Sequence, residues 1–117
     1  MLATFSDARV QLAVGVTDLR KSINGLSILV ADHLDLDPLS GHLFAFCNRR
    51  RDLVKILYWD RNGFCLWQKR LERDKFRWPD SPGDVLNIGG RELNWLLDGL
   101  TLDQQCAHAR LEYSAVL

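Results

Sequence analysis

Hydrophobic positions change their spacing several times along this 117-residue chain, and each change marks a predicted element. Residues 10–15 alternate weakly between apolar and polar and end at a glycine, which predicts a short strand. Apolar residues then recur every three or four positions from Leu19 to Leu34, which predicts an amphipathic helix. We expect Thr17 to cap its start, and Asp37 to mark its end after about four to five turns. Gly25 in its middle predicts either a close approach by another backbone or a bend.

Aromatic and β-branched residues then dominate three short segments, as expected for strands. These segments are 43–47, 53–59 and 64–71. Their short connections make them antiparallel neighbours. Asp60 to Gly63 has the composition of a hairpin turn, although the sequence leaves open whether the turn carries a bulge. If the two strands pair outwards from this turn, Leu53 lies near Arg70.

The remaining third of the chain begins with a linker rich in proline and glycine at 79–83. Residues 85–88 then form a strand or merely extended chain, and 92–100 carries leucines on one helical face. The tail from 101 to 117 has helical composition. These patterns predict one α+β domain over residues 1–117: a small antiparallel sheet of three to five strands packed against an amphipathic helix, with a short C-terminal helix.

Charge is distributed unevenly, although the chain has no net charge. Residues 41–79 contain ten of the fifteen Lys and Arg residues and eight of the eleven aromatic residues. This segment has a net charge of +6, and the rest of the chain therefore has −6. Basic residues interleaved with aromatic ones are typical of nucleic-acid-binding proteins, so we expect the protein to bind nucleic acid.

The predicted hairpin brings two basic clusters to one end of the sheet, where guanidinium groups can neutralise phosphates and release counterions. The alternative is a solvated loop that only keeps the protein soluble. Two further cations fall in the first turn of the predicted helix, where either a phosphate or pairing of Asp18 with Lys21 would offset the unfavourable helix dipole. The candidate DNA-binding residues are Arg20, Lys21, Arg49, Arg50, Arg51, Lys55, Lys69, Arg70 and Arg73.

Aromatic side chains that alternate along strands usually belong to the core, so most of these rings are expected to be buried. Trp78 lies beside Pro79 and outside the predicted strands. We therefore expect it to be exposed and to contact a protein partner.

The sequence carries no pattern typical of an enzyme or a metal site. The three histidines and three cysteines show no CxxC or HxxxH spacing, and no P-loop lysine follows the glycines before the last predicted helix. No nucleophile has an evident base, so neither catalysis nor a cofactor is predicted. An odd number of cysteines, no signal-peptide pattern and no apolar run of membrane-spanning length predict a cytoplasmic protein without disulfides.

Several long strings in the sequence resemble one protein family. GVTDLRK at 15–21, LDPLSGHLFAF at 36–46, residues 48–79 and LNWLLDGL at 93–100 are similar to TnpB, the accessory protein of the insertion sequence 66 family of bacterial transposable elements. The RNA-guided nuclease that shares this name is a different, much larger protein. The chain departs from the family pattern at Cys47, where a basic residue is more usual, and at Asp74, where glycine is usual.

The resemblance implies a small, non-enzymatic accessory factor for DNA transposition and recombination, encoded beside a separate DDE-type transposase. The expected partner is DNA of the element ends, bound through phosphates. The alternative is an interaction module that docks the transposase, or a second copy of itself, without touching DNA.

Overall fold

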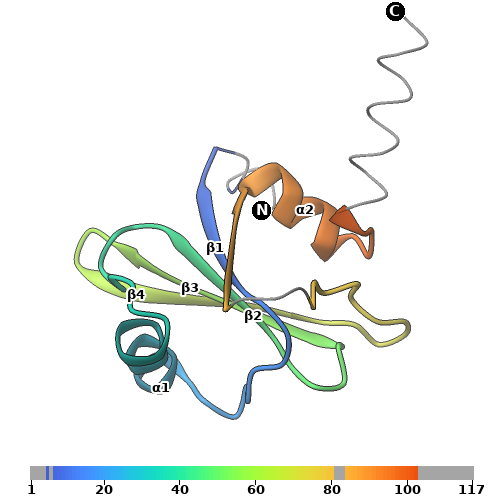
Figure 1. Ribbon diagram of the computed structural model, residues 1–117, viewed down its shortest axis with the longest axis horizontal. Coiled ribbons are helices and arrows are strands. Elements are labelled where there is room, and N and C mark those ends of the chain that lie inside the picture. Colours follow the sequence, from blue (N-terminus) through green and yellow to red (C-terminus); the bar gives the residue numbers. More distant parts are fainter. Residues whose placement is uncertain (1–4, 6, 81–83, 103–117) are drawn as a thin grey trace, which may run out of the picture.

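The computed structural model describes residues 5, 7–80 and 84–102. Within them, one five-stranded sheet lies between two helices (Figure 1). The strands stand in the order β4-β3-β2-β1-β5. The elements are β1 (Arg9–Ala13), α1 (Ile23–Ile28), η2 (Leu29–His33), β2 (Leu43–Cys47), β3 (Leu53–Asp60), β4 (Gly63–Arg70), β5 (Val85–Gly89) and α2 (Gly90–Leu97).

The α+β class, the strands predicted at 43–47, 53–59 and 64–71 and the short helix near the C-terminus are confirmed. The sheet is mixed, since β1 and β2 run parallel while the other neighbours are antiparallel. A parallel pair needs a long crossover, and residues 14–42 provide it through α1 and η2. The segment at 85–88 is a true strand, because β5 pairs with β1 from Val85 to Gly89. The helix expected at 101–117 lies outside the described residues, except for its first two positions.

Each face of the sheet is covered by one helix, as Figure 1 shows. On one face, Leu26 and Val30 of α1 and η2 pack against Phe44, Phe46 and Leu57. The opposite face is covered by α2, and its core contains Leu12, Ala45, Ile56, Phe76, Trp78, Leu93, Leu96 and Leu97. All five residues of β2 are buried, since this central strand is covered on both faces. Most of the aromatic residues of 41–79 are therefore accounted for by packing.

The first helix is shorter than its apolar spacing suggested, and the expected N-cap at Thr17 is wrong. Ser22 precedes the helix instead. Thr17 is buried, and its backbone N–H donates to the carbonyl of Cys47 at 2.8 Å. This bond holds the chain against the end of β2, so a tertiary contact overrides the helical spacing. The α-helix continues as a π-helical turn, in which Leu34 N–H donates to the carbonyl of Leu29.

Gly25 is explained by a close approach, although the approaching group is a side chain rather than a backbone. A Cβ at this position would lie 3.1 Å from Cβ and 3.2 Å from Cγ of Lys21. Contacts this short are tighter than ordinary van der Waals packing, so a larger residue would push the Lys21 stem away. Glycine thus lets that stem lie against the helix.

The hairpin between β3 and β4 forms as predicted. Asp60 pairs with Gly63, and Leu53 pairs with Arg70 at the other end of the ladder. The turn has two residues, with Arg61 at a φ of 58°. This register fixes which charged residues meet at the far end of the sheet.

Candidate nucleic-acid interface

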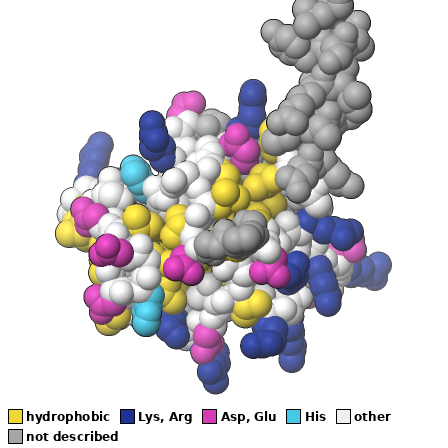
Figure 2. Space-filling model, viewed as in Figure 1, with side chains coloured by type: hydrophobic (Ala, Val, Ile, Leu, Met, Phe, Trp, Pro, Cys, Tyr) yellow, Lys and Arg dark blue, Asp and Glu magenta, His cyan; other side chains and the backbone are white. Residues whose placement is uncertain are grey.

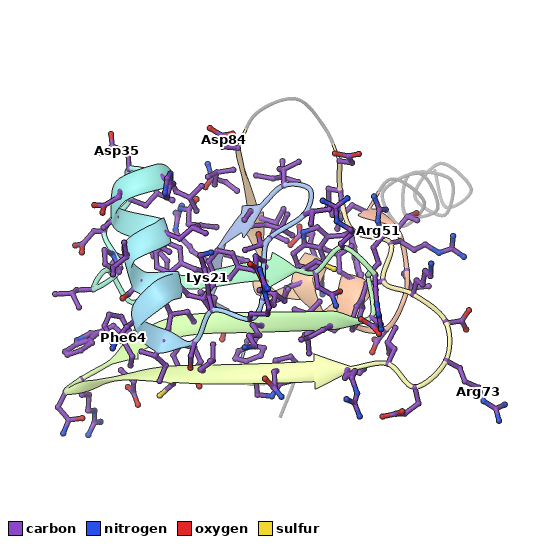
Figure 3. The ribbon with its side chains drawn as sticks, turned by 90° about the horizontal axis from the view of Figure 1, so that it is seen from below. Lys21, Asp35, Arg51, Phe64, Arg73 and Asp84 are labelled. Carbon is purple, nitrogen blue, oxygen red and sulfur yellow. The ribbon has the colours of Figure 1, made fainter. Side chains whose placement is uncertain are left out.

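Three chain segments converge at one end of the sheet. They are the chain after β1, the loop 48–52 between β2 and β3, and the chain after β4. They meet because β1 and β2 are parallel and β4 runs in the same direction, so the last residues of all three strands lie at the same end of the sheet. Arg51 and Arg73 lie at this end in Figure 3, with Phe64 at the opposite end. We call this end of the sheet the basic end. Figure 2 shows Lys and Arg side chains gathered over it at the lower right.

The loop 48–52 is held in shape by Asn48. Its side-chain carbonyl accepts from the backbone N–H groups of Asp52 and Leu53, each at 3.1 Å, and its amide donates to Asp52 Oδ1 at 2.7 Å. Asn side chains stabilise turns in this way. Arg51 adopts a φ of 61°. The loop therefore presents Arg49 and Arg50 to solvent from a fixed backbone.

Two backbone hydrogen bonds tie the chain after β4 to this loop. Leu71 N–H donates to the carbonyl of Asp52, and Phe76 N–H donates to the carbonyl of Arg51, each at 2.7 Å. The predicted approach of the second basic cluster to the Arg49–Arg51 loop is therefore confirmed. Arg73 is exposed on the connecting segment between these two bonds.

Buried and exposed side chains alternate at the end of this segment. Phe76 and Trp78 are buried, at 1% and 3% exposure, while Lys75 and Arg77 are exposed. The two rings anchor the chain to the core, and the two cations consequently face solvent. Lys75 and Arg77 were not among the predicted site residues. Their alternation with aromatic residues in the string KFRW was the available signal.

The expected exposure of Trp78 is wrong. Its indole Nε1–H donates to the carbonyl of Ala13 at 2.9 Å, which joins the chain after β4 to the end of β1. Buried indole N–H groups usually find such a partner, and here the neighbouring strand supplies it. The ring is therefore part of the core and is not available to a partner in this structure.

Two grooves lie at the basic end, one on each face of the sheet. The first groove, about 780 Å³, lies on the α1 side and is lined by Val16, Asp18, Arg20, Arg49 and Arg50 among others. The second groove, about 350 Å³, lies on the α2 side and is lined by Lys69, Arg73, Asp74, Lys75, Arg77 and Asp98 among others. Each groove thus combines several cations with a smaller number of carboxylates.

Asp18 pairs with Arg20 rather than with Lys21 at the edge of the first groove. Arg20 Nη2 donates to Asp18 Oδ2 at 2.7 Å, and Arg20 Nε donates to both carboxylate oxygens at 3.0 and 3.2 Å. These hydrogen bonds hold the pKa of the Asp18 carboxyl well below its usual range. Arg20 and Lys21 both precede the first helix, which begins at Ile23, so their expected placement in its first turn is wrong.

Two of the predicted phosphate ligands use their ammonium groups to support backbone carbonyls. Lys55 Nζ donates to the carbonyls of Leu19 and Lys21, at 2.9 and 3.0 Å. Lys69 Nζ donates to the carbonyl of Leu97 at the end of α2, at 2.9 Å. Both side chains are half-buried. They brace the segments that form the two grooves.

The other predicted residues lie where cations can meet an external anion. Arg20, Arg49, Arg50, Arg70 and Arg73 are exposed at the basic end, although Arg70 also contacts Glu72 Oε1 at 3.3 Å. Lys21 is half-buried beside Gly25, and Arg51 is half-buried with its Nη1 donating to the carbonyl of Trp78 at 3.5 Å.

The described residues bring together no group of three or more His, Cys, Asp and Glu side chains that could hold a metal ion. Cys47 is fully buried, and burial raises the pKa of its thiol to about 12. It therefore stays protonated at neutral pH, unlike a reactive cysteine. Among the helices that the structure describes, none is long and apolar enough to cross a membrane.

Comparison with known proteins identifies the family. The sequence profile described as "IS66 Orf2 like protein" matches residues 8–107. This chain belongs to the IS66 Orf2-like family. Membership implies an accessory role associated with transposition, as the resemblance predicted.

Two relatives come from Sinorhizobium fredii (strain NBRC 101917 / NGR234). The "uncharacterized protein y4hO" is 39% identical over 100 residues, which cover 86% of this chain and 87% of the relative. The "uncharacterized protein y4jC" is 34% identical over 100 residues, covering 86% of each chain. No solved structure shows a significant match.

Proposed function

We propose that this IS66 Orf2-like protein supports transposition by binding DNA phosphates at the basic end of its sheet. One observation carries the proposal: the fold gathers Arg20, Arg49, Arg50 and Arg73, all exposed, from three separate segments. The chain has no net charge, so this gathering depends on topology rather than on overall composition.

The chemistry of these groups favours phosphate over a carboxylate ligand of a protein partner. Several arginines at one edge can each make bidentate contacts to phosphate oxygens, and successive phosphates along DNA repeat that contact. Each neutralised phosphate releases condensed counterions, which adds an affinity that falls with salt. We do not predict base readout, and the proposed binding is independent of sequence.

The test is a titration of labelled duplex DNA from the element ends at several salt concentrations, followed by fluorescence anisotropy. We expect the logarithm of affinity to fall linearly with the logarithm of salt concentration. The double variant Arg49→Ala/Arg50→Ala should reduce the slope by up to about two, since each lost phosphate contact contributes about 0.9. Arg51 is kept, because its half-buried side chain donates to the carbonyl of Trp78 and its loss would also affect the fold.

The matched control is Arg9→Ala/Arg91→Ala. These arginines are also exposed and carry the same charge, but β1 begins at Arg9, at the opposite end of the strand from the basic end. Binding by this control should match the parent protein. Absence of binding at low salt, or equal losses in both double variants, would exclude the proposed interface.

An interaction module that docks the DDE-type transposase, or a second copy of this chain, is the second candidate. Val16, Ile28 and Leu39 are large apolar residues more than half exposed, which favours some protein contact. Co-purification of this chain with the transposase after nuclease digestion, together with no affinity for DNA alone, would support this function instead.

A further inference from the structure

The cations of the basic end line two separate grooves, and this arrangement indicates which form of nucleic acid fits there. The loop 48–52 connects β2 to β3, and its Arg49 and Arg50 line the first groove on the α1 side. The second groove, on the α2 side, is lined by the chain after β4 and the end of α2. Leu19 and Leu53 of the first groove belong to the core under α1. Leu71 and Leu97 of the second belong to the core under α2. A ridge therefore separates two cationic grooves on opposite sides of the sheet.

The loop 48–52 lies between the two segments that carry these cations. On the α1 side, Thr17 N–H donates to the carbonyl of Cys47, just before the loop. On the α2 side, Leu71 and Phe76 N–H groups donate to the carbonyls of Asp52 and Arg51. The loop is also the connection of a two-stranded antiparallel ribbon, β2 and β3. The major groove of B-form DNA is about 12 Å wide and admits a two-stranded β-ribbon, whereas the minor groove is about 6 Å wide.

Single-stranded nucleic acid is the competing ligand, and it is usually bound by exposed aromatic rings on which bases stack. Among the described residues of the basic end, the rings are turned inwards. Phe46, Phe76 and Trp78 are at most 3% exposed. Trp59 and Phe64, which are half-exposed, pack edge to face beside the hairpin turn at the opposite end of β3 and β4.

We infer that the basic end takes B-form duplex DNA, with the loop 48–52 in the major groove and the phosphates of the two strands in the two grooves. This inference rests on the proposed function. Arg49 and Arg50 at the tip of the ridge, with Arg20 beside them, meet one backbone. Arg73, Lys75 and Arg77 meet the other.

Three labelled ligands of equal length and sequence test the inference with the full chain: a DNA duplex, an RNA duplex and single-stranded DNA. The A-form RNA duplex has a similar density of phosphates but a deep, narrow major groove that side chains do not enter. At equal salt we expect the DNA duplex to bind at least about tenfold more tightly than either other ligand, because both backbones can be contacted only there. Equal affinity for the RNA duplex or the single strand would overturn the inference while leaving phosphate binding intact. No binding of any of the three would instead remove the proposed function.

Variants of the two grooves provide a second test. Arg49→Ala/Arg50→Ala and Arg73→Ala/Lys75→Ala should each weaken duplex binding and reduce the salt slope by up to about two, and the four changes together should add. The pair Arg9→Ala/Arg91→Ala again controls for charge, and circular dichroism checks that each variant is folded. If one groove pair has no effect on duplex binding, the duplex does not span the ridge and the inference is wrong.

Discussion

Single residues at the basic end show how backbone geometry and charge are linked. Arg51 and Asp74 both lie in the left-handed region, at φ values of 61° and 67°. Side chains other than glycine rarely adopt this region, with asparagine and aspartate the usual exceptions. The resemblance implies glycine at position 74, and the positive φ of Asp74 is a conformation that suits glycine. Asp74 also places a carboxylate in the second groove.

Replacing Asp74 by glycine should stabilise the protein. The left-handed conformation costs about 1–2 kcal/mol for a residue with a Cβ, and the greater backbone freedom of unfolded glycine offsets about 0.5–1 kcal/mol of that gain. We therefore expect Asp74→Gly to raise the free energy of unfolding by roughly 0.5–1 kcal/mol, measured by urea denaturation. Asp74→Ala is the control, because it removes the same charge and keeps a Cβ. Equal stability of the two variants would contradict the role assigned to φ.

At the scale of elements, locally encoded features were predictable and long-range ones were not. The β3–β4 hairpin follows from the turn at Asp60 to Gly63, and its register brought Arg70 opposite Leu53 as expected. The parallel pairing of β1 with β2 depends on a crossover of nearly thirty residues, which no local pattern reveals. Thr17 was misassigned for a related reason, since its backbone partner is the distant Cys47.

The same limit applies to the candidate site. The basic segment and the meeting of its two clusters could be predicted, since composition and one hairpin determine both. Which cations support the fold and which are exposed could not be predicted, because Lys55 and Lys69 differ from the others only in donating to carbonyls more than 25 positions away in sequence. Likewise, nothing near Trp78 indicates that Ala13 accepts its indole proton.

Lys55 provides a test of this distinction between bracing and binding. Lys55→Met keeps most of the aliphatic stem but leaves the carbonyls of Leu19 and Lys21 without this donor. The free energy of unfolding should fall by about 1–2 kcal/mol, with little change in the salt slope of DNA binding. Lys75→Met is the matched control: this lysine is exposed, so stability should be unchanged while the slope falls by about one. The reverse pattern would show that Lys55 contacts phosphate directly.

For the molecule as a whole, the absence of net charge conceals two ends of opposite character. Cations surround the loop 48–52, whereas Asp32, Asp35 and Asp37 lie at and beyond the end of η2. Figure 3 places Asp35 at the far side of the sheet from Arg51 and Arg73. The eight residues of β3 run between the two ends of the sheet, a length of roughly 25 Å at the usual rise per residue. That length exceeds the Debye length of about 10 Å at 0.1 M salt.

This separation predicts that the position of a charge, rather than the net charge, controls DNA binding. Asp74 and Asp35 are a matched pair, because both are exposed and both have a positive φ, of 67° and 54°, that asparagine tolerates. At 0.1 M salt, Asp74→Asn should tighten duplex binding by about two- to fivefold, since one exposed charge a few ångströms from a phosphate contributes up to about 1 kcal/mol. Asp35→Asn removes the same negative charge at the far end and should change affinity by less than about 1.5-fold, because salt screens this charge from the DNA.

At 0.01 M salt the Debye length grows to about 30 Å, and the difference in affinity between the two variants should narrow. Equal gains from both variants at 0.1 M salt would show that net charge governs binding and would contradict a local interface at the basic end.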